Sequence, residues 1–86
     1  MSKLISLTYT KLKEMTVSRK LYLDEERKAS DNLDYEAAYR CNGLAFIITF
    51  QLFANDTVNN RERKMLDELF NRSLYYYSQL NEQEDK

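Results

Sequence analysis

The sequence predicts an all-α protein, either an antiparallel three-helix bundle or a long helical hairpin with an additional N-terminal helix. Proline is absent and glycine occurs once, at Gly43, whereas sheets depend on turns that use both residues. Two short polar stretches also separate segments in which apolar residues recur at the helical period. We therefore expect one domain, residues 1–86, with helices over residues 10–28, 32–54 and 59–82.

The first expected helix carries one apolar stripe, formed by Leu12, Met15, Tyr22 and Leu23. Thr8 or Thr10 is its expected N-cap, because a threonine hydroxyl accepts hydrogen bonds from the free amides of a first helical turn. Residues 1–9 fit both a helical and an alternating, strand-like period. This segment is therefore expected to be either a short extra helix or an extended arm.

The second expected helix is apolar on two sides. One face is small and aliphatic and contains Ala37, Cys41, Leu44, Ile48 and Leu52. The other face is aromatic and contains Tyr35, Tyr39, Phe46, Phe50 and Phe53. A helix of this kind must be covered on both sides. We therefore expect either that the first and third helices cover it, or that one face packs against a second copy of the chain.

Several residues mark the ends and interruptions of this second helix. Ser30, Asp31 and Asn32 are candidate N-caps, and Asn55 is a candidate for a left-handed C-terminal cap. Asn42 is expected at an edge of the helix surface, or at a symmetric contact where a polar side chain fixes the register. Gly43 predicts a close helix approach or a kink, because glycine destabilises a helix interior.

The third expected helix again has one stripe, which contains Met65, Leu66, Leu69, Phe70, Tyr76, Tyr77 and Leu80. Asn59 followed by Glu62 resembles a capping box, in which the two side chains bond each other's backbone amides. Asp56 and Thr57 are alternative caps. Residues 82–86 contain no apolar side chain, so we expect a frayed tail there.

The composition argues against catalysis, cofactors and metal binding. The chain has no histidine and one cysteine, Cys41, so it lacks the usual proton carrier and cannot form a thiolate cluster. We expect no catalytic residues and a buried, inert Cys41 thiol. The formal charge of −1 creates no field that attracts duplex nucleic acid or membranes. The apolar run 43–54 is shorter than the ~20 residues of a membrane span.

A reduced cysteine and the absence of a secretory signal at the N-terminus predict a cytoplasmic protein. Its function is then expected to be binding. Apolar residues beyond the needs of a bundle predict protein contacts, and these candidates are Val17, Leu21, Tyr35, Tyr39, Phe46, Phe50, Phe53, Tyr75 and Tyr77.

Arg19 is the most informative polar residue, because it lies within the apolar stripe of the first helix. Three interpretations remain open: a snorkelling side chain, an ion pair with Glu26 or Glu36, or a contact to an anionic ligand. In the third interpretation, nearby cations and aromatic rings bind a small ligand such as a nucleotide, and the candidate residues are Tyr9, Lys11, Arg19, Lys20 and Tyr22.

The leading functional hypothesis is a non-enzymatic protein-binding or inhibitory module, of the kind found among phage- or plasmid-type accessory proteins that block a host factor. One alternative is a homo-oligomer that sequesters an anionic ligand between its subunits. A second alternative is a self-assembling structural protein. A homo-oligomer is expected because a chain of 86 residues builds only a marginal core.

Overall fold

The computed structural model describes residues 8–84 of the chain. These residues form three helices, α1 (Tyr9–Asp31), α2 (Tyr35–Asn55) and α3 (Asn60–Glu84), and they contain no strand. The predicted all-helical fold is therefore confirmed. The expected arm lies outside the described residues up to residue 7. The expected tail is helical as far as Glu84, and residues 85–86 are again outside the described part.

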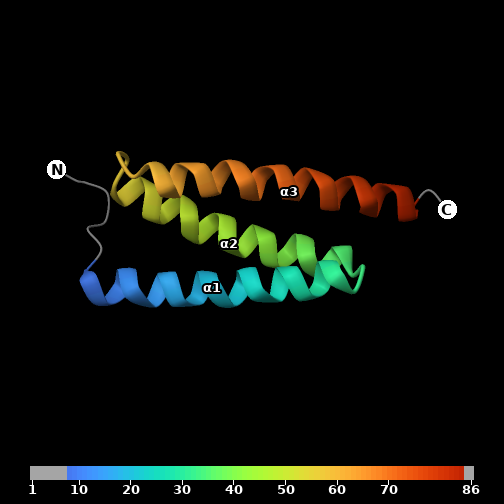
Figure 1. Ribbon diagram of the computed structural model, residues 1–86, viewed down its shortest axis with the longest axis horizontal. Coiled ribbons are helices and arrows are strands. Elements are labelled where there is room, and N and C mark those ends of the chain that lie inside the picture. Colours follow the sequence, from blue (N-terminus) through green and yellow to red (C-terminus); the bar gives the residue numbers. More distant parts are fainter. Residues whose placement is uncertain (1–7, 85–86) are drawn as a thin grey trace.

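The three helices lie along one another in an elongated molecule of 52 × 20 × 20 Å, with α2 between α1 and α3 (Figure 1). The chain runs from left to right along α1, returns along α2 and runs from left to right again along α3 (Figure 1). The backbones of α1 and α3 both pack closely on α2 but, within residues 8–84, not on each other. Long polar side chains bridge the remaining gap.

The helix ends agree with the predicted caps in two places. The Thr8 hydroxyl accepts a hydrogen bond of 3.1 Å from the Lys11 amide and caps α1. The Asn59 side chain accepts from the amides of Arg61 and Glu62 at 3.0 and 3.2 Å and caps α3. The second half of the expected capping box is replaced, because the Glu62 side chain turns inward to a different partner.

The turn between α1 and α2 differs from the prediction. α1 continues to Asp31, and the N-cap of α2 is Asp34, whose carboxylate accepts from the Ala37 amide at 3.2 Å. The Asp34 amide itself donates to the Ala29 carbonyl at 2.8 Å and closes the end of α1. Leu33 adopts the left-handed conformation, with φ 61°. The expected left-handed cap at Asn55 is wrong. Among the described non-glycine residues only Leu33 has a positive φ, so Asn55 is not left-handed.

The core differs from the two-faced pattern that the second helix predicts. The most deeply buried residues of α2 form a strip between the two predicted faces, and this strip contains Ala38, Asn42, Ala45, Thr49 and Leu52. The apolar core of the described chain is small, with Met15, Ala38, Ala45, Leu52, Leu69 and Tyr76. Five polar residues are buried with it, namely Arg19, Glu26, Asn42, Thr49 and Glu62. The centre of this bundle is therefore largely polar.

Asn42 and Gly43 correct two further expectations. Asn42 is only 1% exposed and lies inside the chain rather than at an edge. Gly43 lies in uninterrupted helix, and a Cβ atom at that position would meet no heavy atom within 4 Å. The expected close approach of helices at Gly43 is therefore absent within the described chain.

Candidate functional site

The buried polar residues of the core form two layers along the bundle, here called polar levels. The first level joins all three helices through Arg19 of α1. Its guanidinium donates to both carboxylate oxygens of Glu62 on α3, and Nη1 also donates to the Thr49 hydroxyl on α2 at 3.3 Å. Thr49 in turn donates to the Ala45 carbonyl one turn earlier, at 2.8 Å. The two-pronged pair explains the position of Arg19 in an apolar stripe, because planar guanidinium and carboxylate groups match one another.

The partner of Arg19 differs from the two that the sequence suggested. Glu36 lies on the exposed side of α2, and Glu26 belongs to a second level. Glu62 was missed because it begins the third helix, where a glutamate normally interacts with its own backbone. The structure places it opposite Arg19 only because α3 returns alongside α1 across α2.

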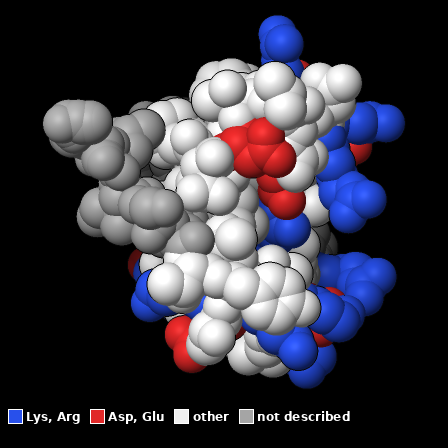
Figure 2. Space-filling model, turned by 90° about the vertical axis from the view of Figure 1, so that its left-hand side faces the viewer, with Lys and Arg blue, Asp and Glu red and all other residues white. Residues whose placement is uncertain are grey.

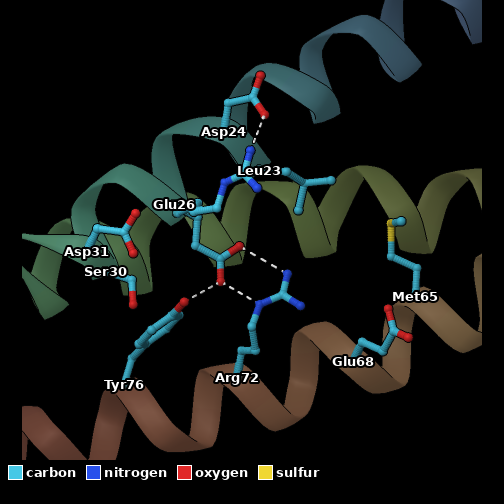
Figure 3. A pocket seen from close by; sticks show the side chains of 10 residues that line it. Leu23, Asp24, Glu26, Ser30, Asp31, Met65, Glu68, Arg72 and Tyr76 are labelled. Carbon is cyan, nitrogen blue, oxygen red and sulfur yellow. Dashed lines mark hydrogen bonds and ion pairs between the residues drawn. The ribbon is translucent and has the colours of Figure 1, made fainter.

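The second polar level is centred on Glu26, which is 2% exposed. Arg72 of α3 donates to its carboxylate from Nε at 2.8 Å and from Nη2 at 3.2 Å, and the Tyr76 hydroxyl donates at 2.7 Å (Figure 3). Asn42 of α2 donates to the same carboxylate at 3.3 Å and to the Leu69 carbonyl at 2.9 Å. One carboxylate thus connects α1 to both other helices.

These contacts decide the ionisation of Glu26. Burial raises the pKa of its carboxyl, but the hydrogen bonds from Arg72, Tyr76 and Asn42 and the charge of Arg72 lower it, and the net pKa lies below the ordinary value. Burial and the hydrogen bond to Glu26 raise the pKa of Tyr76 to about 12. Glu26 is therefore a carboxylate and Tyr76 a neutral phenol at neutral pH.

A pocket of about 510 Å³ opens beside this second level, between α1 and α3 (Figure 3). Its walls carry charges of both signs, from Asp24, Glu26, Arg27, Asp31, Glu68 and Arg72. The buried residue among these is Glu26, and its carboxylate is bonded to Arg72, whose side chain is 43% exposed. Among the described residues, every buried side-chain nitrogen and oxygen has a partner, so both polar levels connect the helices and offer no free reactive group.

The residues predicted to bind an anionic ligand do not gather around Arg19. The Arg19 guanidinium faces inward and is engaged by Glu62. Tyr9, Lys11 and Lys20 are exposed, and the Lys20 ammonium lies 3.7 Å from Asp24 of its own helix. Tyr22 is half-buried. Figure 2 shows that lysine and arginine side chains crowd one side of the molecule at the end where α1 begins, so the basic character remains a surface feature.

The predicted protein-contact residues fall into a group on α2 and α3 and a group on α1. Within the first group two pairs of rings meet: the ring centres of Tyr35 and Tyr75 are 5.9 Å apart, and those of Tyr39 and Tyr77 are 6.2 Å apart. The two pairs lie on different sides of α3, because Tyr75 and Tyr77 point about 160° apart. Phe46 and Phe53 are half-buried, whereas Phe50 is exposed. The other group, Val17 and Leu21, is exposed on α1, about 160° from Arg19 at 100° per residue, and so belongs to a separate surface.

The structure adds exposed apolar residues that the prediction omitted. We call the combined surface the apolar face; it contains Tyr39, Leu44, Ile47 and Phe50 of α2 and Phe70, Leu74 and Tyr77 of α3. A hollow of about 420 Å³ lies within it, lined by Tyr39, Arg40, Asn42, Gly43, Phe46, Phe70 and Ser73. A sequence signal for this face exists, because residues 41–55 contain no charged side chain.

Comparison of the chain with protein-family models, with characterised proteins and with solved structures finds no match. The site must therefore be interpreted from its own chemistry. None of the described helices is long and apolar enough to cross a membrane. Within residues 8–84, no group of three or more histidine, cysteine, aspartate or glutamate side chains is arranged to hold a metal ion.

Proposed function

We propose that this chain is a non-enzymatic binding protein of the cytoplasm, which acts by placing its apolar face on the surface of another polypeptide. One observation carries the proposal. The described residues expose thirteen large apolar side chains and bury only six apolar residues. A small domain that maximised its own stability would reverse this proportion, because burial of apolar surface is the main driving force of folding.

The size of the apolar face also supports binding. Its seven side chains are between 39% and 56% exposed. For side chains of roughly 200 Å² each, the face presents about 700 Å². The largest apolar patch on a typical monomer covers roughly 300–600 Å², and larger patches usually mark interaction sites. At roughly 25 cal/mol per Å², covering this face is worth on the order of 15 kcal/mol before the costs of association.

The chemistry of the remaining groups favours binding over catalysis. Cys41 is half-buried rather than buried as expected. Its partial burial, followed by the nearby charge of Glu25, raises the pKa of its thiol, which makes the thiolate nucleophile scarce at neutral pH. The buried carboxylates are already neutralised by arginine. A role in sequestering an anionic ligand is less well supported, since the guanidinium proposed to recognise the anion is occupied by Glu62.

In the finer form of this proposal, three antiparallel helices present the apolar face as an inhibitory cover for a functional surface on a host factor. Aromatic residues suit this task because large, rigid rings contribute most of the affinity in protein interfaces. The polar levels keep the helices in a fixed order and so keep Ile47, Phe50 and Phe70 on one side.

Affinity capture from the native cell, with a matched control, tests this function. The baits are the wild-type chain, Phe70→Glu within the apolar face and Leu21→Glu outside it; Phe70 and Leu21 are 55% and 60% exposed. The expected result is a protein in stoichiometric amount with wild type and with Leu21→Glu, and at least a tenfold loss with Phe70→Glu. Equal capture by all three baits, or no stoichiometric protein with any, contradicts the proposal.

A further inference from the structure

The outward side of α2 combines large side chains with a notch. Tyr39, Ile47 and Phe50 are 39%, 56% and 55% exposed, and at 100° per residue they point away from the buried strip of this helix. Gly43 and Ala54 fall on the same side. Because a Cβ atom at Gly43 would meet nothing within 4 Å, the packing of the chain itself does not require this glycine.

The large and small residues on this side follow a self-complementary order. Consider two α2 helices packed antiparallel about a two-fold axis that crosses each helix midway between residues 46 and 47. Gly43 of one copy then lies opposite Phe50 of the other, and Tyr39 lies opposite Ala54. The rings of Tyr39 and Phe50 thus meet small residues, Ile47 lies at the axis opposite Phe46 of the other copy, and each pair occurs twice, as a two-fold contact requires.

The charge pattern also favours a second copy as the occupant. Residues 41–55 carry no charge, and the whole chain has a net charge of only −1. The proposed contact also includes Arg40, which lines the hollow and is paired with Glu36 at 3.8 Å. In this register the two Arg40 residues lie toward opposite ends of the contact, so no like charges meet and no unpaired ion is buried. Apart from the Arg40–Glu36 pair at its margin, this side of α2 offers no charge for the electrostatic complementarity that usually selects a different partner.

The available area is that of a stable interface. The apolar face presents about 700 Å² of side-chain surface when Phe70, Leu74 and Tyr77 of α3 flank the α2 contact, and this is close to the ~800 Å² that each partner contributes to a standard interface. The chain also needs the additional burial, since its own apolar core consists of six residues. Chains of this size commonly complete their cores by oligomerisation.

We propose that two copies of this chain form a dimer through antiparallel packing of α2 on α2, with Phe50 of each copy inserted into the notch at Gly43 of the other. This inference rests on the proposed function, because the same apolar face makes the contact. It goes further by naming the partner as a second copy and by fixing the register of the two helices.

The oligomeric state provides the first test. Light scattering coupled to gel filtration, over a range of concentrations, should give wild type twice the chain mass of 10.3 kDa. Gly43→Leu fills the notch and should raise the dimer Kd ~30-fold or more. Since leucine favours helix more than glycine does, and the monomer has space there, this variant should remain folded by circular dichroism. Leu21→Glu, outside the face, should remain dimeric.

Disulfide trapping tests the register. In a Cys41→Ala background, Gly43→Cys and Phe50→Cys are prepared as separate proteins. Upon mild oxidation, a mixture of the two should form a covalent dimer at least tenfold faster than either protein alone, because each new thiol lies opposite the other position. Equal rates in all three samples overturn the proposed register.

The two proposals fail in different ways. A chain that is monomeric at every concentration, or a dimer unaffected by Gly43→Leu, overturns the inference. If a monomeric wild type nevertheless captures a different protein and Phe70→Glu loses it, the binding function stands and the second copy is excluded as occupant. If the dimer forms as described but no other protein is captured, the inference stands and a separate target is excluded.

Discussion

Substitution of Glu26 by alanine should destabilise the protein far more than any surface substitution, because this carboxylate receives hydrogen bonds from three side chains on two helices. The Tyr76 hydroxyl, in a residue 4% exposed, would lose its acceptor, which costs roughly 1–3 kcal/mol for a buried polar group. Arg72 would lose its partner at a smaller cost, since its side chain is 43% exposed and can be solvated by water.

Together with the one buried methylene group that is removed, worth ~0.8 kcal/mol, these losses give a destabilisation of about 3 kcal/mol. An 86-residue chain is expected to be stable by only about 4–13 kcal/mol. The variant should therefore retain a much reduced margin, with a melting temperature lowered by roughly 12–24 °C. Glu26→Gln should lose less, because its amide oxygen still accepts from Tyr76.

Urea unfolding followed by circular dichroism at one fixed protein concentration measures this effect. Glu25→Ala is the matched control. The Glu25 side chain, next to Glu26 in the sequence, is 62% exposed and lies 3.7 Å from Lys28, so this substitution should change the folding stability by less than ~0.5 kcal/mol. Folding lowers the pKa of Glu26. Its contribution to folding stability is therefore present above the unfolded pKa of about 4.3 and is lost as the pH falls through the lower pKa of the folded protein. Equal effects of the two substitutions at pH 7 would refute the central role of Glu26.

Three further predictions follow from the same contacts. Arg19→Ala should cost about 3–5 kcal/mol by leaving Glu62 buried without its partner, whereas the double variant Arg19→Met, Glu62→Leu should recover most of that loss in urea unfolding; a double variant as unstable as the single one would contradict this. The pKa of Tyr76 is about 12 in the folded protein, so its contribution to folding stability is complete below the unfolded pKa of about 10 and is lost as the pH rises through 12. Tyr76→Phe should therefore flatten the alkaline decline of folding stability. It should also remove the last step in an absorbance titration of tyrosinate. The Cys41 thiol, with its raised pKa, should react with iodoacetamide at pH 8 several-fold more slowly in the folded protein than in urea; equal rates would place it outside the packed helix face.

The class of fold was predictable from the sequence because it depends on local properties. The lack of proline, the single glycine and the helical spacing of apolar residues act within a few turns of chain, and local backbone preferences respond to that range. Thr8 and Asn59 were likewise identifiable as caps, since each needs only the amides of the next turn. The exception is the end of α1, where a leucine takes the left-handed position that glycine or asparagine usually occupies.

The pairing of the polar residues was decided by the tertiary structure alone. The sequence marked Arg19 as unusual, but its partner Glu62 lies 43 positions away, and no periodicity within one helix relates them. The sequence predicts Asn42 either at an edge of the helix surface, where polar residues usually lie, or at a symmetric contact, yet it is buried within the chain between Glu26 and the Leu69 carbonyl. Such partners meet only when α1 and α3 are brought to either side of α2, and the free energy of a buried charge depends on that distant neighbour rather than on its own helix.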